Sequence, residues 1–298
     1  MINLQNKHSD FSIFEAVKRK RAISNSSTLD CCYCSAIEYL HALKSQTFRG
    51  IVFDYDLTLH NKHKETEVEN SIFTILNQYL SKGIQIGIAT GNGEYIAQEI
   101  RIKIHSDYWN NVIMGYYNGG FIIPLGFNKS FSDLQASPPE DFKKIINFID
   151  NYIPKGKICS DGIVDNNPFQ LNFFSDEDDG TFYVDLLKKY IREHTVLKIL
   201  QSPHSFDVVP TCSSKLNVCN YMCQNGLNPH EILTIGDSGN YGGNDYELLN
   251  RKYSLSVDQV SGSIDNCWNF SPCNIQNLDA TLFYLEKLHL IGNGLIFF

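Results

Sequence analysis

Two aspartates, Asp54 and Asp56, directly follow the apolar run Ile51–Phe53. A short run of this kind is typical of a buried strand in a parallel sheet. Side chains alternate along a strand, so a continuing strand would aim both carboxylates to the same side. Carboxylates so close together repel each other unless a cation lies between them or one holds a proton. Both solutions suit phosphoryl transfer, in which one aspartate attacks, the other carries a proton and Mg²⁺ shields the charge.

A second strand-like run, residues 84–89, ends at Thr90-Gly91-Asn92-Gly93. A small hydroxyl at a strand end, followed by glycines and a helix start, suits phosphate binding. The threonine can donate through its hydroxyl and the loop through its backbone amides. Taken alone, the Thr-Gly step is equally typical of an ordinary turn.

Two further stretches place charged groups at the ends of expected elements. Lys215 falls in the first turn of a predicted helix, where the helix dipole disfavours a cation, so a nearby anion would explain it. Later, an apolar run ends at the glycine-rich stretch 236–245, which contains Asp237, Asn244 and Asp245. An ordinary turn between strand and helix does not easily explain three polar groups at this point.

These four stretches, in this order, resemble the four motifs of the haloacid dehalogenase-like phosphohydrolases. Asp54–Thr58 is similar to the first motif, DxDx[TV], Thr90 to the second and Lys215 to the third. Residues 236–245 resemble the long GDx₆ND form of the fourth motif, which phosphomannomutases and some sugar-phosphate phosphatases share. Residues 205–210 also resemble the segment that precedes the third motif in those families.

The resemblance implies a role for each motif residue. Asp54 would attack phosphorus and become an aspartyl phosphate, and Asp56 would serve as general acid and then general base. Mg²⁺ would be held by Asp54, Asp237 and the backbone carbonyl of Asp56. The remaining motif residues would serve the same site: Thr90, Gly91, Lys215 and Asn244 would bind the phosphoryl group, and Asp245 would order the nucleophile, the lysine and the metal waters.

The resemblance also implies the architecture around these residues. It predicts an α/β fold, with a doubly wound parallel-sheet core of the Rossmann-like type and an α+β cap inserted between the second and third motifs. We assign residues 1–48 to a helical N-terminal extension. Residues 49–120 and 206–298 form the catalytic core, and residues 121–205 form the cap that sets substrate specificity.

Composition bounds the functional class. The chain has 298 residues and a formal net charge of -8, which argues against broad nucleic-acid binding. No apolar stretch has the length of a membrane span, and the first residues lack the apolar core of a signal peptide, so we expect a cytoplasmic protein. Nine cysteines without such a signal predict free thiols. The cluster Cys31, Cys32 and Cys34 fits the spacing of a zinc site poorly.

The favoured function is therefore a Mg²⁺-dependent phosphatase acting on a small phosphate monoester, with a sugar phosphate as the expected substrate. A phosphomannomutase-like phosphomutase is the first alternative. It would need a second anion site, for which residues 121–205 offer Arg192 with Lys188 and Lys189. Leu57 also stands where the mutases usually have glycine. The other alternative is a non-catalytic regulatory or binding protein on the same scaffold.

Other polar groups are interpreted as solvated surface. The basic run 18–21 reads as an exposed helix face. Solvent exposure is likewise expected for the polar residues of the predicted cap: Asp161, Asp165, Asn166, Asn167, Gln170 and Asn172.

Overall fold

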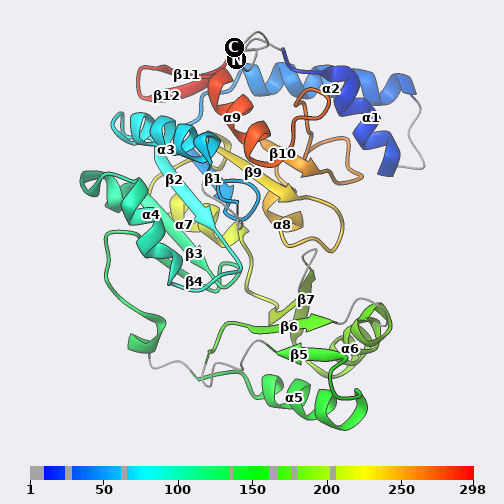
Figure 1. The fold of residues 1–298 in the computed structure, drawn as a ribbon. Coiled ribbons are helices and arrows are strands. Elements are labelled where there is room, and N and C mark those ends of the chain that lie inside the picture. Colours follow the sequence, from blue (N-terminus) through cyan, green and yellow to red (C-terminus); the bar gives the residue numbers. More distant parts are fainter. Residues whose placement is uncertain are drawn as a thin grey trace.

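A six-stranded sheet forms the centre of the protein (Figure 1). The computed structural model describes residues 10–23, 29–61, 66–134, 137–160, 167–175, 180–201 and 206–298. The strands lie in the order β10 (Ser254–Gln259), β9 (Ile232–Ser238), β1 (Gly50–Asp54), β2 (Gln85–Ala89), β3 (Val112–Tyr116) and β4 (Phe121–Pro124). All neighbouring pairs are parallel except β3 and β4.

Helices cover both faces of this sheet, because its central strands are apolar on both sides. In β1, Ile51 and Phe53 face one core and Val52 faces the other. The first face is covered by α3 (Glu67–Leu80), α4 (Ile96–Lys103) and α9 (Asn277–Lys287). The second face is covered by α7 (Leu216–Gln224) and α8 (Tyr246–Leu249). The predicted doubly wound α/β core is confirmed.

A smaller domain, here called the cap, lies below this core in Figure 1 and has its own hydrophobic core. Its antiparallel sheet has the order β5 (Ile158–Ser160), β6 (Leu171–Ser175), β8 (Phe206–Pro210) and β7 (Leu197–Gln201). Two amphipathic helices, α5 (Glu140–Tyr152) and α6 (Gly180–His194), pack their apolar residues into this core. The inserted α+β cap is thus present as predicted.

Two strands belong to a different sheet from the one that the sequence predicted. Residues 121–124, assigned to the cap, form β4 and pair with β3 in the core sheet. The chain reverses there because Tyr117, Asn118 and Gly119 all have positive φ angles of 52°, 54° and 74°. Residues 206–210, assigned to the core, form β8 and pair with β6 and β7 in the cap. The alternation of buried Phe206 and Val208 suits either sheet, so the pattern alone did not decide between them.

The N-terminal segment contains α1 (Ile13–Ile23) and α2 (Leu29–Lys44), as its predicted helical character requires. At the other end, β11 (Leu288–Ile291) and β12 (Gly294–Phe297) form a hairpin, and Leu295 bonds to the backbone of Phe48. The cysteines whose side chains are described are free thiols. Within the described residues, no helix combines the length and apolar character needed to cross a lipid bilayer.

The expectation that the basic run on α1 is a solvated face holds for Lys18 and Arg21, which are exposed, and was wrong for Arg19 and Lys20. Arg19 donates to the backbone oxygens of Asn269, Ser271 and Pro272 at 2.7 to 3.1 Å. The amine of Lys20 is fully buried. It donates to the carbonyl oxygens of Ser261 at 2.9 Å and Asn266 at 2.7 Å, over the ring of Trp268. Arg19 and Lys20 therefore hold α1 against the loop that follows β10.

The buried amine of Lys20 predicts a pH dependence of stability. Burial lowers its pKa to about 8, whereas the pKa of a lysine in an unfolded chain is about 10.4. Between these values the unfolded chain holds a proton that the folded chain has lost, so stability rises with pH. We expect the free energy of unfolding to rise from pH 8 to pH 10, relative to Lys20→Met, by about 2 kcal/mol.

Urea denaturation between pH 7.5 and 10 measures this difference. The matched control is Lys18→Met, because the side chain of Lys18 on the same helix is 64% exposed. Parallel stability curves for the wild type and Lys20→Met would contradict the prediction.

Candidate active site

Three parallel strands bring the predicted motif residues to one edge of the core sheet. Asp54 is the last residue of β1 and is paired in register with Ala89 of β2, so Thr90 follows at the same edge. On the other side of β1, Phe53 is paired with Ile235 of β9, and Asp237 lies two residues further on. Open α/β sheets bind ligands at the carboxyl ends of their strands. The fold thus assembles a site from segments distant in sequence.

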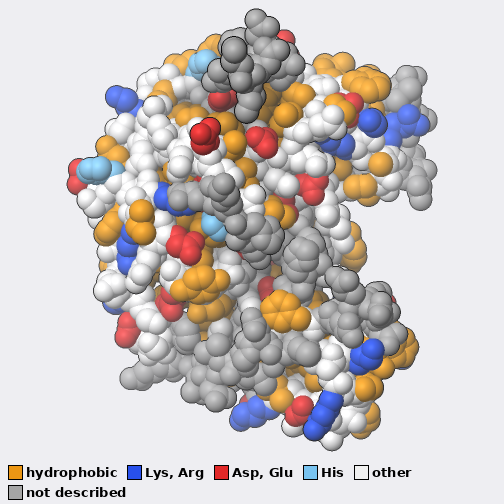
Figure 2. Space-filling model, viewed as in Figure 1, with side chains coloured by type: hydrophobic (Ala, Val, Ile, Leu, Met, Phe, Trp, Pro, Cys, Tyr) orange, Lys and Arg blue, Asp and Glu red, His pale blue; other side chains and the backbone are white. Residues whose placement is uncertain are grey.

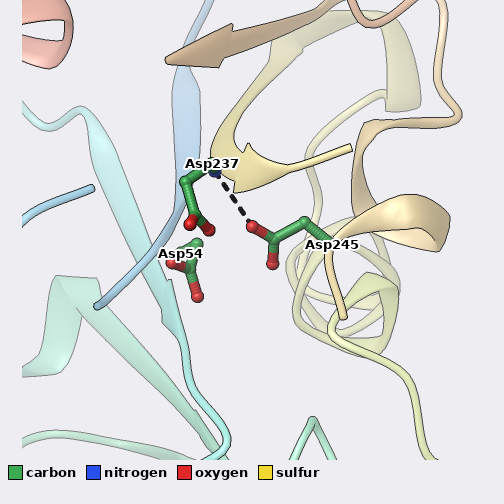
Figure 3. Close-up of side chains that lie close together, drawn as sticks. All are labelled: Asp54, Asp237 and Asp245. Atoms are coloured by element: carbon green, nitrogen blue, oxygen red, sulfur yellow. Dashed lines mark hydrogen bonds between the residues drawn. The ribbon is translucent and has the colours of Figure 1, made fainter. Parts of the chain in front are cut away.

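Three buried carboxylates meet at this edge. Asp54, Asp237 and Asp245 each offer an oxygen that lies within 4.8 Å of the others (Figure 3). Lys215, also buried, donates hydrogen bonds to Asp54 and, at 2.6 Å, to Asp245. It lies immediately before α7, as an N-cap residue without a side-chain cap bond. A cation at a helix start is unfavourable, and it predicted a nearby anion. The carboxylates of Asp54 and Asp245 are that anion.

Asp245 is held in place by the backbone as well as by the lysine. Its second carboxylate oxygen accepts from the amides of Asp237 at 3.0 Å and Ser238 at 3.2 Å, the former drawn in Figure 3. A side chain at Gly236 would place its Cβ 2.6 Å from the same oxygen. Asp245 therefore connects the lysine to the strand end that carries Asp237.

The charges in this cluster do not balance. Burial and the charge of Asp245 raise the pKa of Asp54 to about 8, despite Lys215. Burial and the same carboxylate raise the pKa of Asp237 to about 9. Burial also pushes the pKa of Asp245 upward, but the charge and hydrogen bond of Lys215 hold it below its ordinary value. One ammonium thus offsets one carboxylate and leaves two without compensation.

This donor set fits a divalent cation that prefers oxygen ligands, such as Mg²⁺. A cation there would supply the missing positive charge and hold the carboxyls of Asp54 and Asp237 ionised. Asn244, predicted to serve the same site, has a buried side-chain oxygen without a hydrogen-bond partner among the described residues. An unsatisfied buried oxygen in a loop beside carboxylates is also expected of a group that meets a ligand.

Asp56 lies outside the carboxylate cluster and has its own support. Its Oδ2 accepts from the side-chain amide of Asn92 at 2.8 Å, and the Asn92 oxygen accepts from the hydroxyl of Tyr95 at 2.9 Å. The turn behind Asp56 is tight, and Leu57 has a φ of 59° in the left-handed region. Asp56 is only partly buried, so the described structure leaves this carboxylate near solvent while Asp54 is enclosed.

The loop after β2 contacts the cap through polar groups that the sequence reasoning did not identify. Gln170, expected to be exposed, is buried and donates to the carbonyl oxygen of Gly91 at 2.9 Å. Asn118 donates to Gln170 and to Asp207, both at 2.8 Å. The Asn-Gly-Gly step at 118–120 was the available signal, because it predicts backbone with positive φ.

The other polar residues of the predicted cap differ from Gln170 in their exposure. Asn172 is exposed, as expected, and Asn167 is partly buried. Asp161, Asp165 and Asn166 lie outside the described residues.

Thr90, at the end of β2, is fully buried, and its hydroxyl oxygen accepts from the amide of Asn92 at 3.0 Å, within the loop that it begins.

Comparison with known proteins covers most of the chain. A family model described as haloacid dehalogenase-like hydrolase matches residues 51–161. A second, described as sucrose-6F-phosphate phosphohydrolase, matches residues 162–263. The chain is also 26% identical over 283 residues to a Streptococcus pyogenes protein assigned as a bifunctional phosphatase/peptidyl-prolyl cis-trans isomerase. That match covers 85% of this chain and 57% of the relative, so the chain spans little more than half of the relative's length.

Solved structures share the fold at low identity. A Plasmodium vivax protein assigned as a HAD/COF-like hydrolase has a TM-score of 0.64 at 16% identity, covering 83% of this chain and 98% of its own. The sucrose-phosphatase of Synechocystis, solved with sucrose and phosphate, has a TM-score of 0.52 at 18% identity. That match covers 70% of this chain and 82% of the phosphatase chain.

The carboxylate cluster predicts that Mg²⁺ stabilises the folded protein. A ligand at 100 times its dissociation constant adds about 2.7 kcal/mol, which for a chain of this size is a shift in Tm of about 5 °C or more. We expect millimolar MgCl₂ to produce such a shift in the wild type and little or none in Asp237→Asn. Differential scanning fluorimetry measures it, with KCl of equal ionic strength as the control. An equal shift in both proteins would place the ion elsewhere.

Proposed function

We propose that this chain, which belongs to the haloacid dehalogenase-like hydrolases, is a Mg²⁺-dependent phosphatase that acts on a small phosphate monoester through an aspartyl phosphate. One observation carries the proposal. A buried carboxylate at the end of the central strand, Asp54, is hydrogen-bonded to a buried lysine and faces two further carboxylates. This arrangement supports a nucleophile that works beside a divalent cation.

In the proposed reaction Asp54 attacks phosphorus while the bond from phosphorus to the leaving alcohol oxygen breaks. Asp56 gives its proton to that oxygen. It then takes a proton from water, which attacks the aspartyl phosphate and releases inorganic phosphate and the free carboxylate of Asp54. Asn92, which donates to one oxygen of Asp56, would hold that carboxyl so that its other oxygen meets the leaving group and then the water.

The charged groups around Asp54 have distinct tasks in this scheme. Lys215 would keep the nucleophile oriented and neutralise charge on the phosphoryl oxygens. Mg²⁺ bound by Asp54, Asp237 and the backbone carbonyl of Asp56 would add positive charge facing the same oxygens. Asp245 would fix the lysine, to which it is bonded at 2.6 Å.

The phosphoryl group would be received by the loop after β2 and the loop after β9. The hydroxyl of Thr90 and the amide of Gly91 are the expected donors from the first loop. Asn244 is the expected polar contact from the second loop, where its side-chain NH2 would donate to a phosphoryl oxygen and its unsatisfied oxygen would accept from a metal-bound water. These assignments follow the motif resemblance and the common edge at which the strands end.

A sugar phosphate is the proposed substrate class. The match of residues 162–263 to a sucrose-6F-phosphate phosphohydrolase model supports it, as does the fold shared with a sucrose-phosphatase. The phosphomutase alternative shares this chemistry and differs in the fate of the phosphoryl group. The non-catalytic alternative is disfavoured, because the charged motif residues are present and meet at one edge of the sheet.

Replacing the nucleophile tests the covalent mechanism. We expect Asp54→Asn to abolish release of inorganic phosphate, and to leave the fold intact because Lys215 keeps its ion pair with Asp245. The wild type should form a hydroxylamine-sensitive phosphoenzyme that this variant lacks. Phosphate release from a sugar-phosphate panel and intact mass after rapid quench are the measurements. Asp107→Asn, at an exposed carboxylate, is the control. Normal turnover by Asp54→Asn would exclude the aspartyl phosphate.

Replacing Asn92 tests the assignment of Asp56 as the proton donor. Asn92→Ala should lower kcat/KM for a hexose phosphate by about 10- to 100-fold, because the alkoxide leaving group needs a proton. The same variant should change kcat/KM for 2,4-dinitrophenyl phosphate less than about threefold, since that leaving group departs as an anion. Asn147→Ala on the exposed surface of α5 is the control. Equal losses for both substrates would show that Asn92 serves another step.

A further inference from the structure

A cavity of about 820 Å³ lies between the cap and the core. One wall is formed by α6 and β7 of the cap, and the other by α8 and the loop that follows β9. Ser238, which lines it, is the residue after Asp237 and donates its amide to Asp245. In Figure 2 the surface is hollowed between the two domains. The three carboxylates do not line the cavity themselves, and Ser238 is the lining residue that connects it to their cluster.

Direct contacts between the domains hold the two walls together. Lys198 of β7 forms an ion pair with Glu247 of α8 at 2.7 Å. The amide of Gln201, also on β7, donates to the carbonyl oxygen of Gly242 at 3.3 Å. The cavity is therefore formed by the arrangement of the domains in this structure, rather than being a surface groove of either domain alone.

The cap wall of the cavity carries an excess of positive charge. Lys188, Arg192 and Lys198 line it, and the carboxylate that lines the facing wall, Glu247, is already paired with Lys198. Lys188 lies 3.1 Å from the side-chain oxygen of Gln201 and 3.6 Å from Asp185. Within the part of the chain that the structure describes, Arg192 has no hydrogen bond or ion pair. These two cations face the cavity in a chain whose net charge is -8.

The core wall offers an aromatic surface. Tyr241 is 88% exposed, and its ring meets that of Tyr246 edge-on at 5.4 Å, so one tyrosine supports the other. An exposed aromatic ring beside polar side chains suits the apolar face and the hydroxyls of a sugar or similar polyol. The cavity therefore combines groups for a polyhydroxylated body with cations for an anion.

We propose that this cavity receives the leaving group of a phosphate ester that carries a second acidic group, and that Lys188 and Arg192 bind that second anion. The inference rests on the proposed phosphatase function and adds a substrate class to it: a polyol phosphate with a carboxylate or a second phosphate. The phosphoryl group to be cleaved lies at the carboxylate cluster, and the second anion lies against α6 of the cap. Arg192 and Lys188 are specificity residues in this scheme, without a part in the chemical step.

Two substrates that differ in one group test the proposal. Glucose 6-phosphate and 6-phosphogluconate share a carbon chain and a phosphate, and only the second carries a carboxylate. We expect the wild type to have the lower KM for 6-phosphogluconate. Arg192→Ala and Lys188→Ala should each raise that KM by about 10- to 100-fold, the range for a charge-assisted hydrogen bond, with kcat and the kinetics of glucose 6-phosphate within about twofold. Fructose 1,6-bisphosphate against fructose 6-phosphate gives the corresponding comparison for a second phosphate.

Lys189→Ala is the matched control, because Lys189 lies on the same helix, is exposed and does not line the cavity. It should leave every constant unchanged. Equal KM values for the two wild-type substrates, together with no effect of Arg192→Ala, would overturn the inference. Selectivity lost equally in Lys189→Ala would also overturn it, since a general attraction to α6 would then suffice.

Failure of the proposed function can be distinguished from failure of this inference. If the wild type hydrolyses neither sugar phosphate, calorimetric titration with 6-phosphogluconate and glucose 6-phosphate still tests the cavity. Tighter binding of the acid, lost in Arg192→Ala and kept in Lys189→Ala, would support the anion site while the phosphatase proposal fails. Equal affinities would overturn the anion site. Transfer of phosphate within a bisphosphate, without release, would support the site and favour the phosphomutase.

Discussion

The ion cluster of Lys215 with Asp54 and Asp245 is the interaction on which the site depends. Its three side chains are at most 3% exposed, so each charge has lost its water and must be compensated inside the protein. Removing Lys215 would leave both carboxylates without a partner, and the loss of one partner of a buried ion pair typically costs about 3 to 5 kcal/mol. Lys215 offsets one carboxylate of the cluster, which leaves the second carboxylate and Asp237 without a compensating charge. A cation at the three carboxylates would compensate these charges, so the stability of the site and its proposed chemistry would have the same requirement.

Close backbone packing keeps the lysine in position. Gly119 has a φ of 74°, and a Cβ there would collide with the carbonyl oxygen of Ser214, the residue before Lys215. The turn that ends β3 therefore packs directly against the start of α7. The preceding residue, Asn118, also bonds to Gln170 and Asp207 of the cap. The turn at residues 117–119 thus contacts the segment before Lys215 and, in the cap, both Gln170 and Asp207.

The sequence predicted the parts of this site that depend on local chemistry. Asp54, Thr90 and Asp237 each follow an apolar run, and polar groups at the ends of parallel strands must share an edge. It did not predict properties that depend on tertiary partners. Lys20 lies in a run of four basic residues, and only the carbonyl oxygens near Trp268, far along the chain, make its burial possible. Gln170 is buried because Gly91 and Asn118 satisfy its side-chain amide. The strands β4 and β8 belong to a different sheet from the one predicted, because alternation of apolar residues does not identify the neighbouring strand.

The two charge distributions at the domain boundary have opposite signs. The core contributes carboxylates in excess of its one buried lysine, whereas the cap wall contributes Arg192, which has no ion pair among the described residues, and Lys188, whose only ion pair there is a 3.6 Å contact with Asp185. A chain of net charge -8 repels anions at long range, but salt screens exposed charges beyond about 8 to 10 Å. Inside the cavity the nearest charged groups therefore determine whether an anion is attracted or repelled. A cation bound by the core would attract the phosphoryl group and the cap the second anion, so a substrate with two anionic ends would be oriented by charge before the reaction begins.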